Sequence, residues 1–222
     1  VAAAAEQCFP KGGGGDNLDG WWRYHNPIEV KYANDAIEQF PAVVRRVFAA
    51  LASPPLVEFF RELTGISDLQ SDEFLHGAGL HVHPRGGRLM LHLDYEQHPR
   101  APHMERRLNI ILYLSRGWDP AWNGATELWD AALSKCVVKS EVCFNRALIF
   151  RTNDISWHGM PDMIRCPPNT RRQSLAFYYI SSLHSAPAGD KAGANGHGFR
   201  QKACFVQRPG DAPDERLATL LA

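Results

Sequence analysis

Short apolar segments separated by Gly, Pro and Asn fill the chain from Phe74 onward, and no helical segment interrupts them. This spacing is typical of short β-strands joined by tight turns. Closely spaced strands without interleaved helices favour a β-sandwich or a barrel over an α/β fold. We therefore expect a mainly β protein, with strands near residues 79–83, 88–94, 108–114, 126–129, 136–139, 147–151 and 172–180.

The segment before these strands has a helical pattern. Between residues 32 and 63, apolar side chains recur at steps of three and four residues, as in the run from Phe40 to Leu51. Ser53-Pro54-Pro55 interrupts the pattern, and Gly65 ends it, because glycine is frequent just beyond a helix C-terminus. The sequence predicts two helices that pack outside the barrel. The side chains that we expect to be buried are Phe40, Val44, Val47 and Phe59.

The length and composition of the chain limit how it can be divided into a domain and terminal segments. A chain of 222 residues is long enough for one sizeable hydrophobic core. Residues 11–15 read KGGGG, so we expect a flexible N-terminal segment over residues 1–16. Residues 17–184 are expected to form a single domain. Residues 185–222 begin with a Gly- and Ala-rich stretch, which predicts a loose C-terminal extension with a short helix near residues 214–221.

The charge balance excludes some classes of protein. Lys and Arg total 24, as do Asp and Glu, so no basic excess indicates a nucleic-acid partner. No apolar run approaches the roughly 20 residues of a membrane-spanning helix. The five cysteines lack CxxC spacing, which favours reduced thiols and a cytoplasmic location. A targeting segment upstream of Val1 would not be visible, and the oligomeric state is left open.

A histidine and an aspartate interrupt the apolar run LMLHLDY of residues 89–95. A buried, unpaired carboxylate costs several kcal/mol, so a partner must hold Asp94. On a strand, positions i and i+2 face the same side, so His92 and Asp94 project together. Two such side chains suit one divalent metal ion, although a hydrogen-bonded polar pair at the end of a strand has the same spacing.

Other residues strengthen the metal interpretation. His158 follows the apolar strand at 147–150, and Arg172 and Ser174 share one face of a later strand, with Arg171 on the other. Two histidines and one carboxylate form the facial triad of non-haem Fe(II) oxygenases, which leaves coordination positions open. A bidentate 2-oxo acid and O₂ would occupy these positions. An arginine fork beside a hydroxyl would bind the far carboxylate of the 2-oxo acid.

In this order, His92-x-Asp94, His158 and Arg172-x-Ser174 resemble the iron- and 2-oxoglutarate-dependent dioxygenases, specifically the prolyl-4-hydroxylase-like branch. The resemblance extends over about residues 79–180, in the blocks GLHVHPRGGRLMLHLDY, RRLNIILYLSRGWDPAWNGATELWD and NRALIFRTNDISWHGMP. It implies a double-stranded β-helix, which is a jelly-roll, cupin-like barrel with flanking helices. It also implies Fe(II) as cofactor, 2-oxoglutarate and O₂ as cosubstrates, and ascorbate as an optional reductant.

The resemblance also implies residue roles. His92, Asp94 and His158 match the iron ligands, and Arg172 matches the residue that binds the distal carboxylate of 2-oxoglutarate, with Ser174 assisting. Tyr113 matches a tyrosine that hydrogen-bonds the same carboxylate. His83 stands where relatives carry a cosubstrate-lining tyrosine, and the segment between His158 and Arg172 is longer than is usual in the branch.

The implied reaction is hydroxylation of an unactivated C–H bond. The substrate would be a peptidyl residue such as proline, or a small molecule, and its identity stays open because substrate loops vary over a constant barrel. Residues 96–107 form either a solvated surface loop, which is the default expectation, or a substrate lid in which His98, Arg100 and His103 could contact the substrate. Two alternatives are a catalytically silent binding module on the same barrel and a zinc hydrolase with the same three ligands.

Overall fold

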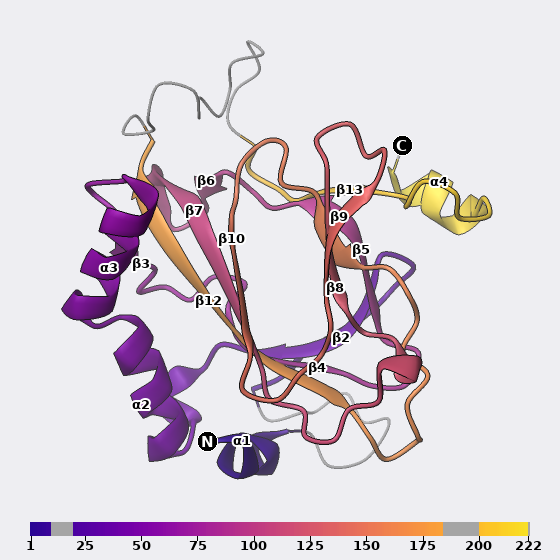
Figure 1. The fold of residues 1–222 in the computed structure, drawn as a ribbon, viewed down its shortest axis with the longest axis horizontal. Helices are drawn as coiled ribbons and strands as arrows, with labels where there is room; N and C mark the ends of the chain where they lie inside the picture. Colours follow the sequence, from indigo (N-terminus) through magenta and orange to yellow (C-terminus); the bar gives the residue numbers. More distant parts are fainter. Residues whose placement is uncertain (10–19, 184–199, 222) are drawn as a thin grey trace.

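Two antiparallel β-layers face each other in the computed structural model, which describes residues 1–9, 20–183 and 200–221. One layer has the strand order β10-β7-β12-β4, the other has the order β5-β11-β8-β9, and β2 joins β4 to β5 at one side (Figure 1). This is a double-stranded β-helix, as expected. The strands are β1 (Trp22–His25), β2 (Glu29–Asn34), β3 (Gln70–Ser71), β4 (Gly79–His83), β5 (Arg88–Leu93), β6 (Gln97–His98), β7 (Ala101–Tyr113), β8 (Thr126–Trp129), β9 (Cys136–Ser140), β10 (Ala147–Arg151), β11 (His158–Met160), β12 (Arg172–Ser182) and β13 (Cys204–Val206).

Two helices cover the outer face of the layer that contains β12 (Figure 1). Phe48 packs against Phe177 with ring centroids 6.2 Å apart, and Phe60 packs against Tyr179 at 5.0 Å. The helices therefore close the main hydrophobic core against the outside of the barrel. The helices of the described residues are α1 (Ala2–Cys8), α2 (Ala42–Leu51), α3 (Pro54–Thr64) and α4 (Glu215–Leu221), with short 3₁₀ turns at Ile37–Gln39 and Pro120–Trp122.

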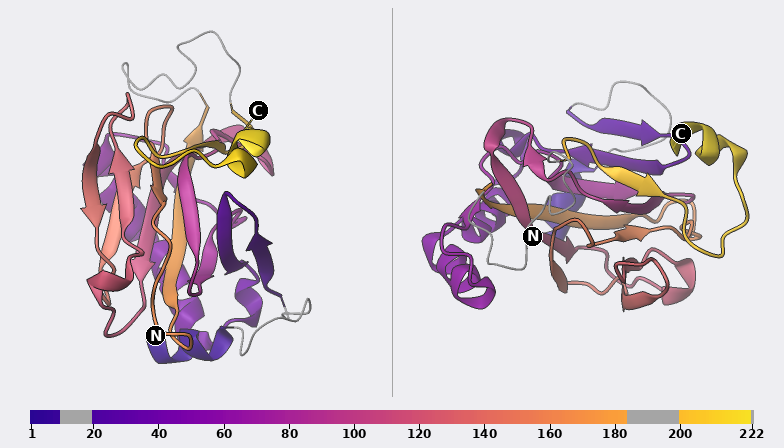
Figure 2. Two further views of the ribbon diagram at one scale, coloured as in Figure 1. Left: turned by 90° about the vertical axis from the view of Figure 1, so that its right-hand side faces the viewer. Right: turned by 90° about the horizontal axis from the view of Figure 1, so that it is seen from above.

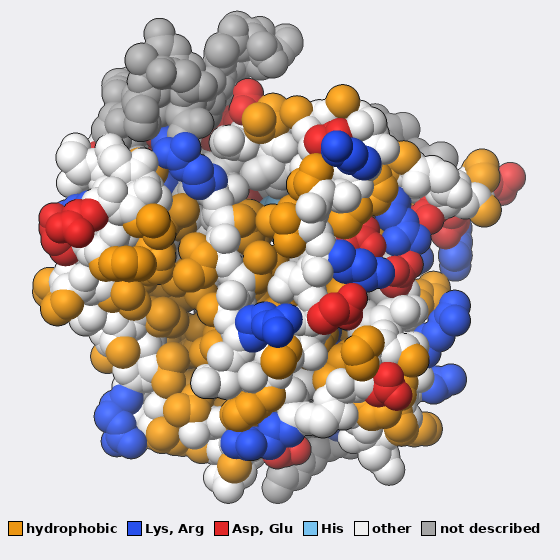
Figure 3. Space-filling view, viewed as in Figure 1, with side chains coloured by type: hydrophobic (Ala, Val, Ile, Leu, Met, Phe, Trp, Pro, Cys, Tyr) orange, Lys and Arg blue, Asp and Glu red, His pale blue; other side chains and the backbone are white. Residues whose placement is uncertain are grey.

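The predicted helical segment needs two corrections. It begins at Ala42 after the turn at 37–39, because Tyr32–Asn34 belongs to β2 and pairs with β4. Phe40 and Val44 are buried and Val47 is half-buried, but Phe59 is 52% exposed. Val57 and Phe60 form the buried face of α3, and the helical period turns Phe59 away from it. Figure 3 shows that hydrophobic side chains gather on the side of the molecule where Figure 1 draws α3.

Both ends of the chain contribute more than expected. The predicted flexible N-terminal segment is wrong for residues 1–9, because α1 forms there and Ala5 and Phe9 lie in the main core. Residues 10–16 of that prediction lie outside the described residues. The predicted loose C-terminal extension needs correction at β13, which pairs with β5 and crosses one end of the barrel (Figure 2). Helix α4 begins one residue after the predicted start, while residues 185–199 lie outside the described ranges.

The strands and the cysteines agree with the sequence expectations. All seven predicted strands are present, β7 being longer than expected and beginning at Ala101. The five cysteines are free thiols. None of the helices in the described part of the chain is long and apolar enough to cross a membrane.

Candidate functional site

A cavity of about 270 Å³ lies between the two β-layers, and its lining includes most of the predicted site residues. His92 comes from β5, Asp94 follows the end of the same strand, and His158 begins β11. Because His158 pairs directly with His92 in the antiparallel ladder, the two imidazoles lie side by side, with ring centroids 4.2 Å apart. The next residue is Gly159, where a Cβ would lie 2.7 Å from the Met90 carbonyl oxygen, so only glycine permits this close pairing.

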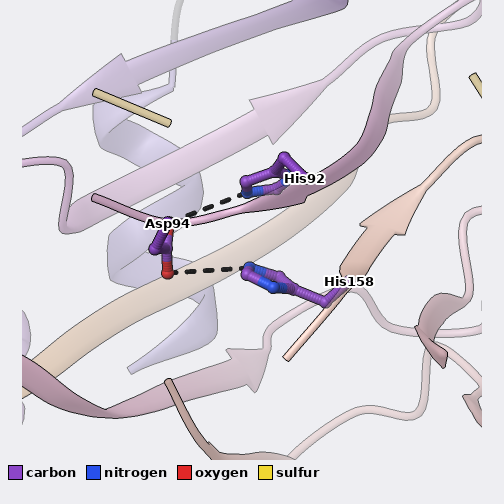
Figure 4. Close-up of side chains that lie close together, drawn as sticks. All are labelled: His92, Asp94 and His158. Carbon is purple, nitrogen blue, oxygen red and sulfur yellow. Dashed lines mark ion pairs between the residues drawn. The ribbon is translucent and has the colours of Figure 1, made fainter. Parts of the chain in front are cut away.

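The ligand-capable atoms of His92, Asp94 and His158 lie within 4.8 Å of one another (Figure 4). The Nε2 atom of His92 is 3.7 Å from Asp94 Oδ1, and the Nε2 atom of His158 is 3.7 Å from Asp94 Oδ2. Within the described ranges, this is the only group of at least three His, Cys, Asp or Glu side chains close enough to hold one metal ion. The sequence predicted this grouping, and the barrel brings it together.

Backbone carbonyls set the tautomer of both histidines. The Nδ1 atom of His92 is 2.9 Å from the Met90 carbonyl oxygen, and that of His158 is 2.9 Å from the Ser156 carbonyl oxygen. A carbonyl oxygen only accepts a hydrogen bond, so each Nδ1 carries the hydrogen and each Nε2 presents its lone pair to Asp94. Metal-binding histidines are oriented in this way.

The charge states also suit a divalent cation. Burial, followed by the neighbouring His158, lowers the pKa of His92 to about 3, so its imidazole is neutral at physiological pH. Burial alone would raise the pKa of Asp94, but the charge and the hydrogen bond of the Arg106 guanidinium hold it well below its usual range. Asp94 Oδ2 is buried and accepts no hydrogen bond from the described residues. A carboxylate whose two oxygens face the two Nε2 lone pairs, one of them without a hydrogen bond, fits a divalent metal ion.

Two phenylalanines cover these histidines on their outer sides. The ring of Phe205, in β13, stacks on His92 at 5.1 Å and 27°, and the ring of Phe150 lies 4.7 Å from His158. Phe205 pairs with His92 across the β13–β5 ladder, so a residue from the C-terminal segment lines the cavity beside the triad. The apolar rings limit the access of water to the histidines.

A second cluster surrounds the Arg172 guanidinium, which is buried. Arg172 donates hydrogen bonds through Nε to the Gly124 carbonyl oxygen (2.8 Å), through one terminal nitrogen to Thr126 Oγ1 (3.1 Å), and through the other to Ser174 Oγ (3.4 Å). No carboxylate of the described ranges forms an ion pair with Arg172. Burial lowers its pKa from the ordinary value, yet an arginine stays protonated. The cavity therefore contains a cation that neutral acceptors alone contact.

The other predicted cosubstrate residues lie around the same guanidinium. Ser174 follows Arg172 on the inner face of β12 and pairs with Tyr113 of β7. The Tyr113 hydroxyl is 3.0 Å from Thr126 Oγ1 and 3.3 Å from the Ser140 carbonyl oxygen. Its ring centroid lies 5.2 Å from the centre of the Arg172 guanidinium. Tyr113 and Ser174 thus flank Arg172, with Thr126 as a shared hydrogen-bonding partner.

His83 lies opposite Arg172, because the two residues pair in the β4–β12 ladder. Both of its ring nitrogens are buried without a hydrogen-bond partner in the described protein, as is Nε2 of His81 on the same strand. Burial, followed by the charge of Arg172, holds the pKa of His83 well below its usual range. Unsatisfied buried imidazoles in a cavity wall are a feature that a bound ligand would explain.

The predicted lid is a β-hairpin in the structure. Most of residues 96–107 belong to β6 and β7, which pair with each other. The His98 side chain is fully buried, with its Nε2 3.3 Å from an Asp72 carboxylate oxygen, so it does not line the cavity. Arg100 and His103 are exposed and do not belong to the cavity lining either. None of these three residues lines the cavity, and the lid role of residues 96–107 stays a prediction.

Three residues of the site were not identified from the sequence. Thr126 contacts Arg172 and Phe205 pairs with His92, and both of these partners are far away in the chain, so no local pattern marks them. Arg106 carried a usable signal, since the ionisable triplet Glu105-Arg106-Arg107 interrupts a long strand, as His92-x-Asp94 does in its own. A buried charge in such a position needs a partner.

Comparisons with known proteins agree with this geometry. The family model described as the 2OG-Fe(II) oxygenase superfamily matches residues 78–180. A Pseudomonas putida prolyl-4-hydroxylase crystal structure superimposes with a TM-score of 0.53 at 17% identity, covering 80% of this chain and 84% of that chain. A Trichoplax adhaerens prolyl hydroxylase, in complex with a hypoxia inducible factor oxygen degradation domain peptide fragment, gives 0.50 at 14%, covering 73% and 71%. These two structures share the fold. No curated protein sequence matched the chain.

Proposed function

We propose that the chain is a 2-oxoglutarate-dependent oxygenase of the 2OG-Fe(II) oxygenase superfamily, whose model matches residues 78–180, and that His92, Asp94 and His158 hold its Fe(II). The observation that carries the assignment is that the two Nε2 atoms and the Asp94 carboxylate lie within 4.8 Å of one another in a buried cavity. Three protein ligands leave the remaining positions of the metal open for other molecules.

The bound iron, with 2-oxoglutarate and O₂, supplies the oxidising power for the hydroxylation of an unactivated C–H bond. The protein's own residues then have three tasks. The carbonyls of Met90 and Ser156 hold the imidazoles with Nε2 toward the metal site. Phe205 and Phe150 shield the histidines from water. The pairing of β5 with β11 fixes the distance between the two imidazoles.

We propose that Arg172 binds the distal carboxylate of 2-oxoglutarate. Its guanidinium has no anionic partner in the described protein, and a charge-assisted bond to a carboxylate would offset the cost of burying it. Ser174, Tyr113 and His83 border the same space and provide further hydrogen-bonding groups. The zinc-hydrolase alternative gives no role to this cluster, and a silent binding module gives no role to the complete triad.

The substrate is proposed to be a peptidyl residue, with proline as the first candidate, or a small molecule. The two structures compared above are of prolyl hydroxylases, and one of them carries a bound peptide. The cavity of about 270 Å³ is at the small end of the range for ligand pockets. Once 2-oxoglutarate occupies part of it, the remaining space suits one side chain or a small molecule.

The test is turnover of 2-oxoglutarate to succinate by the protein reconstituted with Fe(II) under anaerobic conditions and then exposed to O₂. Proline-containing peptides, free proline and other free amino acids are compared, with mass spectrometry to detect an added oxygen atom. His158→Ala is the matched control. A stimulation of succinate formation by one substrate class, absent in His158→Ala, is the expected result. An Fe(II)-loaded wild-type protein without succinate formation under any condition would contradict the proposal.

A further inference from the structure

Asp94 contacts a buried arginine through Oδ1, the oxygen that lies 3.7 Å from His92 Nε2, while Oδ2 faces His158. The Arg106 side chain, in β7, is 2% exposed, and its terminal nitrogen Nη1 lies 2.9 Å from Asp94 Oδ1. The other terminal nitrogen donates to the His76 carbonyl oxygen at 3.0 Å. The two oxygens of the carboxylate are therefore unequal, because Oδ1 accepts a charge-assisted hydrogen bond and Oδ2 accepts none in the described protein.

Two tyrosine rings enclose the Arg106 guanidinium. Its central carbon lies 3.9 Å from the ring centroid of Tyr95 and 3.5 Å from that of Tyr178. The hydroxyls of these tyrosines donate to the carbonyl oxygens of His76 (3.0 Å) and Gly77 (2.8 Å), so each ring is fixed at its outer end. A planar guanidinium between two fixed rings has little freedom to rotate.

We infer that Arg106 is a positioning residue, which orients Asp94 so that the metal binds through Oδ2 alone. A carboxylate that binds through one oxygen leaves more open positions on the metal than a carboxylate that binds through both. Without Arg106, the carboxylate could rotate about its side-chain bonds and present either oxygen or both. The inference rests on the proposed function, because it takes His92, Asp94 and His158 as the ligands.

Three features distinguish this role from that of a structural ion pair. Arg106 contacts a proposed ligand directly. Its geometry is fixed by aromatic stacking and by a backbone acceptor in addition to the carboxylate. The neighbouring Arg107 is equally buried, pairs with Glu105 at 3.0 Å and does not line the cavity. Arg107 therefore offers a matched control for the removal of a buried arginine from the same strand.

The experiment measures Mn(II) binding, with the free ion counted by its electron paramagnetic resonance signal. The proteins are wild type, Arg106→Gln, Arg106→Lys, Arg107→Gln and His158→Ala, and thermal unfolding of each without metal reports its stability. Arg106→Gln is expected to bind Mn(II) about tenfold to a hundredfold more weakly than wild type, the usual cost of losing a residue that orients a ligand. Arg106→Lys should recover part of the affinity, because an ammonium group keeps the charge but neither the fork nor the stacking.

Arg107→Gln is expected to lose stability and to keep wild-type Mn(II) affinity. The Arg106 inference fails if Arg106→Lys and any folded Arg106→Gln protein bind Mn(II) as wild type does, or if Arg107→Gln weakens binding equally. The proposed function fails in a different way, namely if His158→Ala binds Mn(II) as tightly as wild type. If Arg106→Gln does not fold, a wild-type affinity in Arg106→Lys suffices to overturn the inference.

Discussion

Two buried arginines line the same cavity and differ in what they contact. Arg106 has a carboxylate partner at 2.9 Å and lies between two aromatic rings. Arg172 contacts one backbone carbonyl and two hydroxyl oxygens, and no carboxylate of the described residues approaches it. A buried charge requires compensation. The charge of Arg106 is balanced by Asp94 within the protein, whereas the charge of Arg172 is suited to an anion that binds from outside. The presence or absence of a carboxylate partner thus distinguishes Arg106, which orients Asp94, from Arg172, which is suited to bind an anionic ligand.

The largest effect expected from this comparison concerns stability. Asp94→Ala leaves the Arg106 charge buried without its partner, which should lower the free energy of unfolding by about 3–5 kcal/mol. Arg172→Ala removes a charge that has no anionic partner, so the metal-free protein should lose much less stability. Chemical denaturation of both variants without metal or 2-oxoglutarate measures the difference. Equal losses in the two variants would break the distinction between the arginines.

The second effect concerns cosubstrate binding. A charge-assisted hydrogen bond is worth about 1.5–3 kcal/mol, so Arg172→Ala should weaken 2-oxoglutarate binding about tenfold to a hundredfold or more while metal affinity changes little. Arg172→Lys should recover part of the loss, since one point charge replaces a fork. The measurement is a titration of 2-oxoglutarate into the Mn(II)-loaded proteins.

Two controls accompany that titration. Pyruvate lacks the distal carboxylate, so its affinity should be nearly the same in wild type and Arg172→Ala. Arg171 precedes β12 and does not line the cavity, so Arg171→Ala should bind 2-oxoglutarate as wild type does. If Arg171→Ala loses the affinity and Arg172→Ala keeps it, the assignment of the anion site is wrong.

The smallest effect concerns Tyr113, whose hydroxyl contacts Thr126 beside Arg172. Tyr113→Phe keeps the ring and removes one neutral hydrogen-bonding group, which is worth about 0.5–1.5 kcal/mol. We expect 2-oxoglutarate binding to weaken by about twofold to tenfold, with pyruvate and Mn(II) binding unaffected. An effect as large as that of Arg172→Ala would mean that the tyrosine, and not the arginine, dominates recognition of the distal carboxylate.

The parts of this molecule that the sequence predicted have one property in common. Each was indicated by a pattern among residues that are close together in the chain. Short apolar segments between turn-forming residues marked the strands at β4, β5 and β12. The i, i+2 spacing of His92 and Asp94 indicated a shared face on one strand. The same parity argument separated Arg172 from Arg171, and the structure places Arg172, not Arg171, in the cavity lining.

The parts that the sequence did not predict depend on partners that are remote in the chain. Tyr32–Asn34 continues an apparent helical period, yet it forms a strand because β4 is available for pairing. Phe205 lies beyond a Gly- and Ala-rich stretch, and only the β13–β5 ladder brings it to His92. The β6–β7 hairpin is an exception, because its paired residues are close in the chain, but residues 96–107 are rich in charge and proline and carry no strand pattern.

The position of β5 has a consequence for how the protein folds. This strand pairs with β2, β11 and β13, which come from widely separated parts of the chain. Each pairing closes a long loop, and loop closure costs entropy before the new contacts compensate for it. Proteins with many non-local pairings fold slowly for this reason. His92 and His158 therefore become neighbours only after β11 has joined the sheet, so nascent chains lack a preformed cation site until the barrel has closed.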